Sequence, residues 1–273
     1  MIPSSFDYRR AASLEEAITL LSEGGEDVKL LAGGHSLLPL MKLRLASPSL
    51  LVDIAPVREL SYVRDAGDHI AVGSLTRHAD VHHSDVVRAA VPILAHVAGQ
   101  IGDPQVRHRG TIGGSIAHGD PASDLPAVCL ALRATFVLVG PTGERLVPAT
   151  EFFTSFLETA LARDEVLTEI RLPKVPAAGW SFQKFSLRAQ DWAIVGVAAV
   201  RNGTTGVALV NMADTPVLAA GVEAAVSGGA SAAEAAEHAS DGLEPPSDVR
   251  SSGEYRRHLA TVLVRRALEE AGG

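Results

Sequence analysis

Two short stretches, Ala32-Gly33-Gly34-His35-Ser36 and Thr111-Ile112-Gly113-Gly114-Ser115, each place a glycine pair within two residues of a serine. Glycine has no Cβ and adopts positive φ readily, so backbone N–H groups in such turns can converge on an anion. One stretch of this kind is weak evidence, because most are plain tight turns. Together, the two stretches predict one diphosphate held between them, with Ser36 and Ser115 as additional hydroxyl donors.

The sequence around each stretch strengthens this prediction. A strand predicted at 27–31 runs into the first stretch and a helical turn is predicted at 37–42, which is anion-binding geometry. The second stretch lies in a polar loop between Ile101–Gly110 and His118-Gly119-Asp120-Pro121-Ala122-Ser123-Asp124. Neither stretch matches the dinucleotide fingerprint, the P-loop or the serine-hydrolase elbow, so these three classes are disfavoured.

The remaining elements mix helices and strands without a regular βαβ period. Ser13 and Glu16 have capping-box spacing before a helix at 14–23, and further helices are expected at 76–83 and 84–99. Strands are expected at 50–54, 70–73, 134–139 and 145–147. Prolines at 173 and 176 mark a domain boundary. Beyond it, strands at 180–187, 192–201 and 206–212 are expected to form an antiparallel meander, with helices at 219–226, 230–239 and 255–271 packed on it.

Composition narrows the class of protein. The chain has 273 residues with 32 acidic against 24 basic side chains, a net charge of −8, which argues against nucleic acid or an anionic membrane as main partner. Its single cysteine, Cys129, lies in an apolar run and is expected to be buried; one thiol cannot form a disulfide, a zinc site or an iron–sulfur cluster. The N-terminal residues show no signal pattern and the apolar run 193–200 is too short to span a membrane, so we expect a cytoplasmic protein without a membrane span.

Several polar residues leave alternatives open. His78, His82 and His83 have a spacing that suits a metal, but a solvated helical face is the better interpretation because no further ligand cluster accompanies them. Asp124 either caps the helix that follows, a role that Ser123 could also take, or contacts a ligand.

Other polar residues point to specific ligand groups. Asp120, Ser123 and Asp124 suit the hydroxyls of a ribityl or ribose chain, because carboxylates accept hydrogen bonds from hydroxyl groups. Lys184 and Arg188 are expected to share a strand face, either beside a phosphate or a flavin edge or as ordinary surface charge.

In combination, the two glycine stretches, the Asp-Pro-Gln-Val-Arg segment at 103–107 and the segment 118–124 resemble the FAD-binding medium subunit of molybdenum hydroxylases. The resemblance is greater to the carbon monoxide dehydrogenase flavoprotein than to the flavin domain of xanthine dehydrogenase. It implies an α+β fold: a two-part FAD-binding domain of the vanillyl-alcohol-oxidase (PCMH) type, divided at 1–55 and 56–176, and an α+β C-terminal domain at 177–273.

The resemblance also implies the site. The glycine stretches would hold the FAD pyrophosphate, Asp124 would bind the FAD chain, Ile101 and Leu167 would line the flavin, and Lys184 would lie at its edge. The implied cofactor-binding residues are Lys29, Ala32, Gly33, Gly34, His35, Ser36, Ile101, Thr111, Ile112, Gly113, Gly114, Ser115, Asp124, Leu167 and Lys184. No catalytic or metal-binding residue is expected in this chain. The family usually has Asp or Asn at the position of Ser115, and the shorter hydroxyl implies an altered FAD contact.

The resemblance further implies partners. Such subunits work with a small subunit carrying two [2Fe-2S] clusters and a large subunit carrying the molybdenum cofactor, as a dimer of heterotrimers. The chain would then be an oxidoreductase subunit that passes electrons from the clusters through FAD to a quinone, NAD or oxygen. A stand-alone FAD-dependent oxidoreductase of the same fold is the alternative, and a scaffold that has lost FAD is a third interpretation. Substrate and acceptor stay open.

Overall fold

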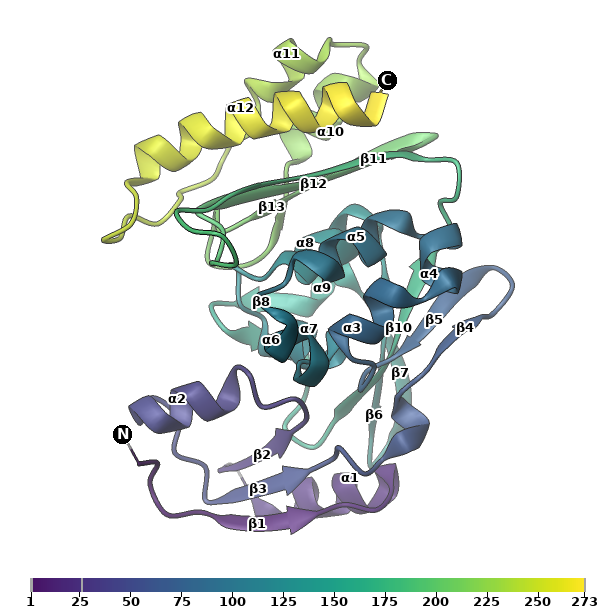
Figure 1. Cartoon of the computed structure of the whole chain (residues 1–273), viewed down its shortest axis with the longest axis vertical. Helices are drawn as coiled ribbons and strands as arrows, with labels where there is room; N and C mark the ends of the chain where they lie inside the picture. The colour runs from purple at the N-terminus through teal and green to yellow at the C-terminus, as the bar shows by residue number, and fades with distance from the viewer. Residues whose placement is uncertain (1, 26, 273) are drawn as a thin grey trace.

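The computed structural model describes residues 2–25 and 27–272, which build three tiers along the long axis of the molecule (Figure 1). The N-terminal residues form a small parallel sheet with one helix beneath it. A larger antiparallel sheet and a group of helices form the middle tier, and a second antiparallel sheet covered by three helices forms the C-terminal tier. The fold is therefore α+β, as expected.

The N-terminal tier pairs strands in the order β1-β3-β2, all parallel. Its elements are β1 (Asp7–Arg10), α1 (Leu14–Gly24), β2 (Val28–Leu31), α2 (Leu37–Leu43) and β3 (Leu50–Asp53). The predicted helix at 14–23 is confirmed, and the Ser13 hydroxyl accepts from the N–H of Glu16 at 3.2 Å, as an N-cap does. The strands at 27–31 and 50–54 are also confirmed, whereas β1 carries no alternation that predicts it.

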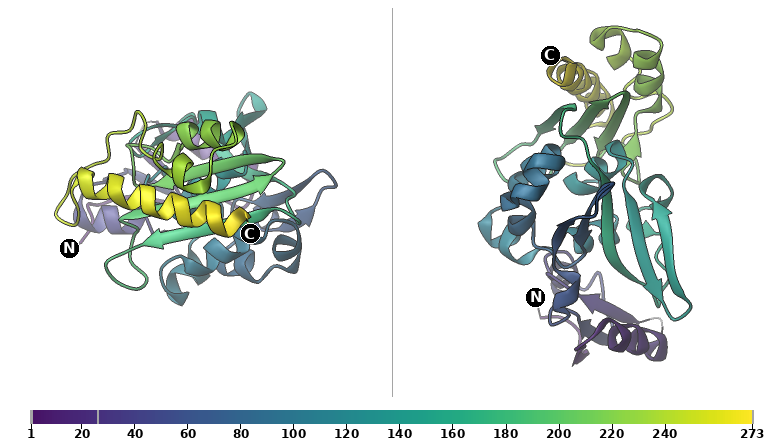
Figure 2. Two further views of the ribbon diagram at one scale, coloured as in Figure 1. Left: turned by 90° about the horizontal axis from the view of Figure 1, so that it is seen from above. Right: turned by 90° about the vertical axis from the view of Figure 1, so that its right-hand side faces the viewer.

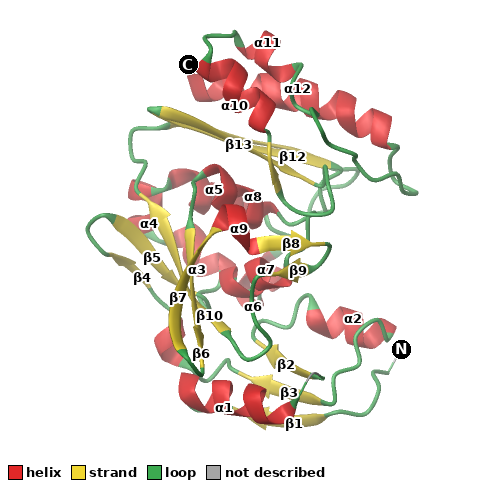
Figure 3. Cartoon of the chain, turned by 180° about the vertical axis from the view of Figure 1, so that it is seen from behind, coloured by secondary structure: helices red, strands yellow, loops and turns green. Residues whose placement is uncertain are grey.

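The middle tier is an antiparallel sheet with the strand order β4-β5-β10-β6-β7. These strands are β4 (Val63–Asp65), β5 (His69–Gly73), β6 (Thr135–Gly140), β7 (Gly143–Pro148) and β10 (Val166–Pro173). Smaller elements are η1 (Arg58–Leu60), α9 (Ala149–Phe152), β8 (Phe153–Ser155) and β9 (Glu158–Thr159). The helices lie on one side of this sheet, and the view from behind shows its strands in front of them (Figure 3).

The helices of this tier are α3 (His78–His83), α4 (Asp85–Ala90), α5 (Pro92–Gln100), α6 (Pro104–Arg109), α7 (Ile112–His118) and α8 (Asp124–Ala131). The expectation of one helix at 84–99 was wrong: Pro92 has no N–H to donate, so α4 ends at Ala90 and α5 starts at Pro92. On α4, Val86 is 38% exposed, whereas Val87 beside it is fully buried. The expectation of a polar loop around the second glycine stretch was also wrong, because α6 and α7 occupy most of residues 104–118.

The C-terminal tier places a sheet between two layers of helices (Figure 2). Strands β11 (Gly179–Phe185), β12 (Val195–Asn202), β13 (Thr204–Val210) and β14 (Val217–Leu218) pair antiparallel in that order, and α10 (Ala220–Ser227), α11 (Ala232–Ala236) and α12 (Gly253–Gly272) follow. The meander and the helices are confirmed. The second strand begins at Val195 instead of residue 192, so Trp192 lies in the turn before it.

Buried apolar side chains hold the tiers together. Cys129 is fully buried in α8, as predicted, and burial raises the pKa of its thiol to about 12. Strands β12 and β13 pack on α8 from one side and β11 and β12 pack on α12 from the other. Within the described ranges, no helix has both the length and the apolar character needed to cross a membrane.

Candidate functional site

The two glycine stretches lie against each other although Gly33 and Gly113 are 80 positions apart in the chain. A Cβ on Gly33 would overlap the carbonyl oxygen of Arg109 and lie 2.8 Å from the Cα of Gly110. A Cβ on Gly114 would lie 4.0 Å from the Cβ of Ala32. Only glycine at position 33 permits this approach of backbone to backbone. The fold therefore brings residues 32–36 and 109–115 together, as the sequence predicted.

The first stretch turns the chain from β2 into α2 and leaves backbone donors free. Gly34 adopts φ +77°, a conformation that L side chains rarely adopt. No protein oxygen within residues 27–272 accepts a hydrogen bond from the N–H of Gly33, Gly34, His35 or Ser36. Converging free N–H groups are the donor set that binds a phosphate.

The second stretch is the first turn of α7, and its N–H groups are already used. Thr111 is the N-cap, and its hydroxyl accepts from the N–H of Gly114 at 3.1 Å. The N–H groups of Ile112, Gly113 and Ser115 donate to Thr76 O, Ser74 O and Thr111 O. The expectation that both stretches offer free N–H groups therefore holds for the first and not for the second. The second stretch contributes the close packing that its glycines allow, and Ser115 beside them is half-buried.

Basic side chains surround this contact in a chain that is acidic overall. Arg77 donates to the carbonyl of Arg109, and Arg107 donates to the carbonyls of Ile101 and Gly102 at 3.0 and 3.2 Å. His35 and Arg109 are exposed beside them. Asp53 and Asp80 also lie near Arg77, so the surroundings carry both signs of charge, and the basic groups are the ones that favour an anionic ligand.

His78 is a buried base next to this contact. It is 4% exposed, packs against Gly110, and its Nδ1 finds no partner among the described residues. Burial, together with His35, Arg77 and Arg107, lowers the pKa of His78 to about 4. The imidazole is consequently neutral in the folded protein at pH 7.

We expect His78 to make the protein less stable in mild acid. Its folded pKa lies below the unfolded value of 6.5, so its stabilising effect is complete above pH 6.5 and is lost as the pH falls toward 4. The loss should reach about 3 kcal/mol at pH 4. Urea unfolding of the wild type and of His78→Gln across this range tests it, since other titrations cancel in the difference. A constant difference between the two proteins would contradict it.

Asp124 and Lys184 form a buried ion pair between the middle and C-terminal tiers. Lys184 Nζ donates to Asp124 Oδ2 at 2.7 Å, and the two side chains are 13% and 6% exposed. Burial raises the pKa of Asp124, and the charge of Lys184 opposes this rise. Asp124 Oδ1 is buried without a hydrogen-bond partner among the described residues.

Asp124 does not take the capping role that the sequence left open. Ser123 is the N-cap of α8 by its backbone, but neither its hydroxyl nor the Asp124 carboxylate makes a capping hydrogen bond. The Asp120 carboxylate accepts from Ala122 N–H at 2.8 Å and fixes the turn before α8. Asp124 thus keeps one free acceptor oxygen, which is unusual for a buried carboxylate.

A polar pocket of about 360 Å³ opens beside Lys184. We call it the Lys184 pocket; it is lined by Gly99, Gln100, Gly102, Arg107, Lys184, Ser186, Gln190 and Asp191. The sequence pointed to Lys184 and to the segment containing Arg107, but not to Gln190 or Asp191, which carry no local motif. Arg188, expected on the same strand face as Lys184, lies beyond the end of β11 at Phe185.

The remaining predicted residues differ in their surroundings. Ile101 is half-buried and directly precedes Gly102 of the Lys184 pocket, and Leu167 is 5% exposed in the core of the middle tier. Lys29 is exposed on β2.

Two of the three histidines considered for metal binding have protein partners instead. His82 and His83 contact the carbonyl oxygens of Ala95 and Ala79, each at 2.8 Å. Across the described part of the chain, no three His, Cys, Asp or Glu side chains are grouped to hold a metal ion.

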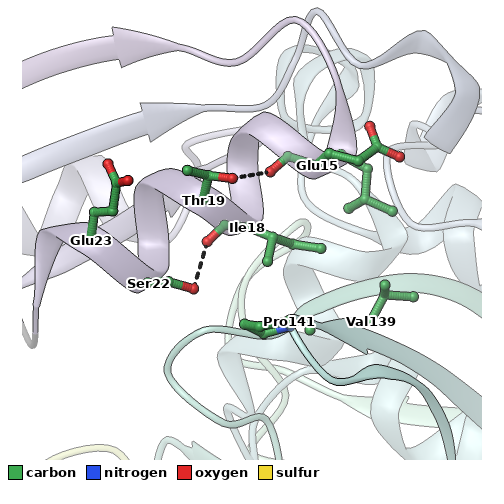
Figure 4. Close-up of a pocket in the computed structure, with 9 residues that line it drawn as sticks. Glu15, Ile18, Thr19, Ser22, Glu23, Val139 and Pro141 are labelled. Carbon is green, nitrogen blue, oxygen red and sulfur yellow. Dashed lines mark hydrogen bonds between the residues drawn. The ribbon is translucent and has the colours of Figure 1, made fainter.

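A second pocket, of about 490 Å³, lies between α1 and the turn joining β6 to β7 (Figure 4). Its hydroxyls are satisfied within the helix, since Thr19 donates to Glu15 O and Ser22 to Ile18 O. It contains none of the predicted site residues. The chemistry therefore concentrates at the glycine contact, the Asp124–Lys184 pair and the Lys184 pocket.

Comparison with known proteins identifies the family of the chain. Residues 4–175 match the FAD-binding domain of molybdopterin dehydrogenases and residues 180–271 match the C-terminal domain of CO dehydrogenase flavoproteins. The carbon monoxide dehydrogenase medium chain of Hydrogenophaga pseudoflava is 43% identical over 99% of this chain and 98% of its own length. The xanthine dehydrogenase FAD-binding subunit of Escherichia coli O157:H7 is 29% identical over 97% of this chain and 95% of its own.

A solved structure supports the same assignment. Carbon monoxide dehydrogenase from Hydrogenophaga pseudoflava, in a form lacking the Mo-pyranopterin moiety, contains a chain with TM-score 0.96 and 44% identity, covering 100% of this chain and 99% of that one. The greater similarity to the carbon monoxide dehydrogenase flavoprotein than to xanthine dehydrogenase is confirmed. The chain belongs to the family of FAD-binding medium subunits of the molybdenum hydroxylases.

Proposed function

We propose that this chain carries FAD and passes electrons from the [2Fe-2S] clusters of a small partner subunit to an external acceptor. FAD supplies two-electron redox chemistry when bound. The carrying observation is the buried, unpartnered Oδ1 of Asp124, held in place by Lys184 between the glycine contact and the C-terminal sheet. A buried acceptor without a donor is costly unless a ligand hydroxyl donates to it.

The other groups of the site fit the parts of FAD. The free N–H groups of residues 33–36 would hold the diphosphate, with the Ser115 hydroxyl opposite and Arg77 and Arg109 supplying positive charge. Asp124 would accept from a ribityl hydroxyl. Lys184 would lie at the flavin edge in the Lys184 pocket, with Ile101 and Leu167 on its apolar side. We also propose Lys29 as a cofactor-binding residue, because it is an exposed cation on β2, the strand that leads into the first turn.

We also include the partners and boundaries in the proposal. We propose a small iron–sulfur subunit and a large molybdenum subunit as partners, in a dimer of heterotrimers. The medium-chain relatives support this, and the single buried thiol agrees with a cytoplasmic location. The division at 1–55, 56–176 and 177–273 is supported by hydrophobic clusters that largely follow the three tiers. The reaction's substrate is bound by the large subunit in this proposal.

Copurification and a visible spectrum test the proposal. The tagged full chain, produced with the neighbouring genes of its operon, should copurify with an iron–sulfur and a molybdenum subunit and show flavin absorption that substrate reduces. A yellow monomer that is active alone would instead favour the stand-alone FAD oxidoreductase. A colourless chain, alone and in the complex, would contradict FAD binding.

Ser115→Asn should strengthen FAD binding. The longer amide can donate and accept at the contact with the first stretch, where the hydroxyl of Ser115 reaches less far, so we expect affinity to rise about tenfold. Titration with FAD, followed by quenching of flavin fluorescence, measures the dissociation constant. Ser227→Asn at the exposed end of α10 is the matched control. Unchanged or weaker binding by Ser115→Asn would contradict the role of this position.

A further inference from the structure

The turn between β11 and β12 forms one wall of the Lys184 pocket. Ser186, Gln190 and Asp191 of this turn line the pocket. The tip of the turn is exposed, and Gln190 has φ +66°, which is uncommon for a non-glycine residue. Inside the turn, the N–H of Trp192 donates to the Asp191 carboxylate at 2.8 Å. A segment with so few internal contacts needs anchors elsewhere to keep one conformation.

The anchors come from the end of β13 and from α12. At the base of the turn, the Ile194 N–H donates to Phe185 O at 2.8 Å. The side-chain amide of Asn211 donates to Ala193 O at 2.9 Å, and Arg256 Nη1 donates to Ile194 O at 2.6 Å. Two successive carbonyls at the base of the turn are therefore each held by a side chain from a distant part of the sequence.

Arg256 is the centre of these contacts. Its side chain is fully buried, its second Nη donates to Asp248 Oδ2 at 2.9 Å, and Nη1 also reaches Asn211 O at 3.4 Å. Burying a guanidinium costs free energy, so the side chain needs hydrogen-bond acceptors where it is buried. These acceptors together fix its position. A planar guanidinium can serve three acceptors at once, which an ammonium cannot do in the same geometry.

The contacts continue to the pocket and to the α8 region. Asp191, which lines the pocket, accepts from Arg250 Nη1 at 3.3 Å, and Arg250 N–H donates to Asp248, the partner of Arg256. Asn211, at φ +62°, donates through its backbone to Pro121 O, just before Asp124 in the chain. The turn, the start of α12 and the segment leading to Asp124 thus form one connected network, at the same end of the C-terminal tier (Figure 1).

The geometry points to Arg256 as a positioning residue that, with Asn211, holds the β11–β12 turn in the conformation that shapes the Lys184 pocket. The hydrogen-bond partners of Arg256 all lie outside the pocket lining, so its effect passes through the turn. That Arg256 holds the turn rests on these contacts alone, whereas the consequence for FAD binding rests on the proposed function.

Limited trypsin digestion of the full chain measures how firmly the β11–β12 turn is held. Arg188 is exposed in the turn, and Arg163, exposed between β9 and β10, is an internal reference. Arg256→Lys should raise the cleavage rate at Arg188 relative to Arg163 about tenfold, because cleavage follows the population of the open turn. Asn211→Gly, which keeps the backbone conformation and removes one anchor, should produce a smaller rise in the same direction.

Arg257→Lys, on the exposed side of α12, is the matched control and should leave the ratio unchanged. An unchanged ratio in a folded Arg256→Lys protein would overturn the proposal. If that variant does not fold, Asn211→Gly decides alone, and a wild-type ratio there overturns it. Purely global destabilisation would raise cleavage at both arginines and leave their ratio constant, which also overturns it.

FAD titration of the same proteins measures the consequence of a mobile turn for FAD affinity. Both variants should bind FAD more weakly than wild type, Arg256→Lys by about tenfold, while Arg257→Lys binds as wild type does. A mobile turn with unchanged FAD affinity would overturn the link to the pocket. Failure of the wild type to bind FAD would count against the proposed function, while the cleavage ratio would still test the anchoring.

Discussion

Gly33→Ala is expected to lower FAD affinity at least about 100-fold, or about 2.7 kcal/mol. The new Cβ would overlap Arg109 O and lie 2.8 Å from the Cα of Gly110, and both are backbone atoms that cannot rotate away. The two glycine stretches must therefore separate. In the proposed function, the two stretches form the two sides of the diphosphate site. Separating them means that the N–H donors of residues 33–36 and the second stretch can no longer contact the same diphosphate.

Gly228→Ala is the matched control for this substitution. Gly228 has φ −77° at the end of α10, and a Cβ there would meet atoms at an ordinary 3.4 Å. FAD titration and thermal melting of the two variants distinguish the site from a general effect of losing glycine. Gly33→Ala should also melt a few degrees lower, since forcing atoms into a packed contact costs about 1–3 kcal/mol. Wild-type FAD affinity in Gly33→Ala would show that the contact is not part of the site.

Asp124→Ala is expected to destabilise the fold by about 3–5 kcal/mol, the usual cost of leaving one member of a buried ion pair unpaired. Lys184, 13% exposed, would keep its charge without the carboxylate that balances it. The double variant Asp124→Ala/Lys184→Met removes both charges and should recover most of this stability. Denaturant unfolding of the two single variants and the double variant gives the coupling between the side chains.

FAD binding should respond differently from stability. On the proposed function, Asp124 Oδ1 accepts from a ribityl hydroxyl, so the double variant should recover stability but bind FAD about 10- to 100-fold more weakly than wild type. Glu269→Ala, which breaks the exposed Arg265–Glu269 pair, should change stability by less than about 1 kcal/mol. Full recovery of FAD affinity in the double variant would mean that the Asp124–Lys184 pair only supports the fold.

Local sequence signals located much of the fold. Ser13 with Glu16, followed by Gly25, fixed the ends of α1, because capping and chain reversal are decided by neighbouring residues. The strands predicted at 192–201 and 206–212 located the β12–β13 hairpin in the same way. Prediction failed where a proline split an apparent helix at Pro92 and where Thr111 capped a helix that begins with glycines.

The site, like the fold, has some features that local sequence determines and others that only the tertiary structure decides. The sequence by itself determined the glycine turn at 32–36 that we propose binds the diphosphate, the buried single thiol and the family, because each depends on residue types in short, ordered stretches. The tertiary structure alone decided that Gly33 meets Gly110, that Asp124 pairs with Lys184 across 60 residues, and that Arg256 holds the β11–β12 turn. These contacts join segments whose separation along the chain carries no pattern, and only the packing of the tiers fixes which side chains are buried together.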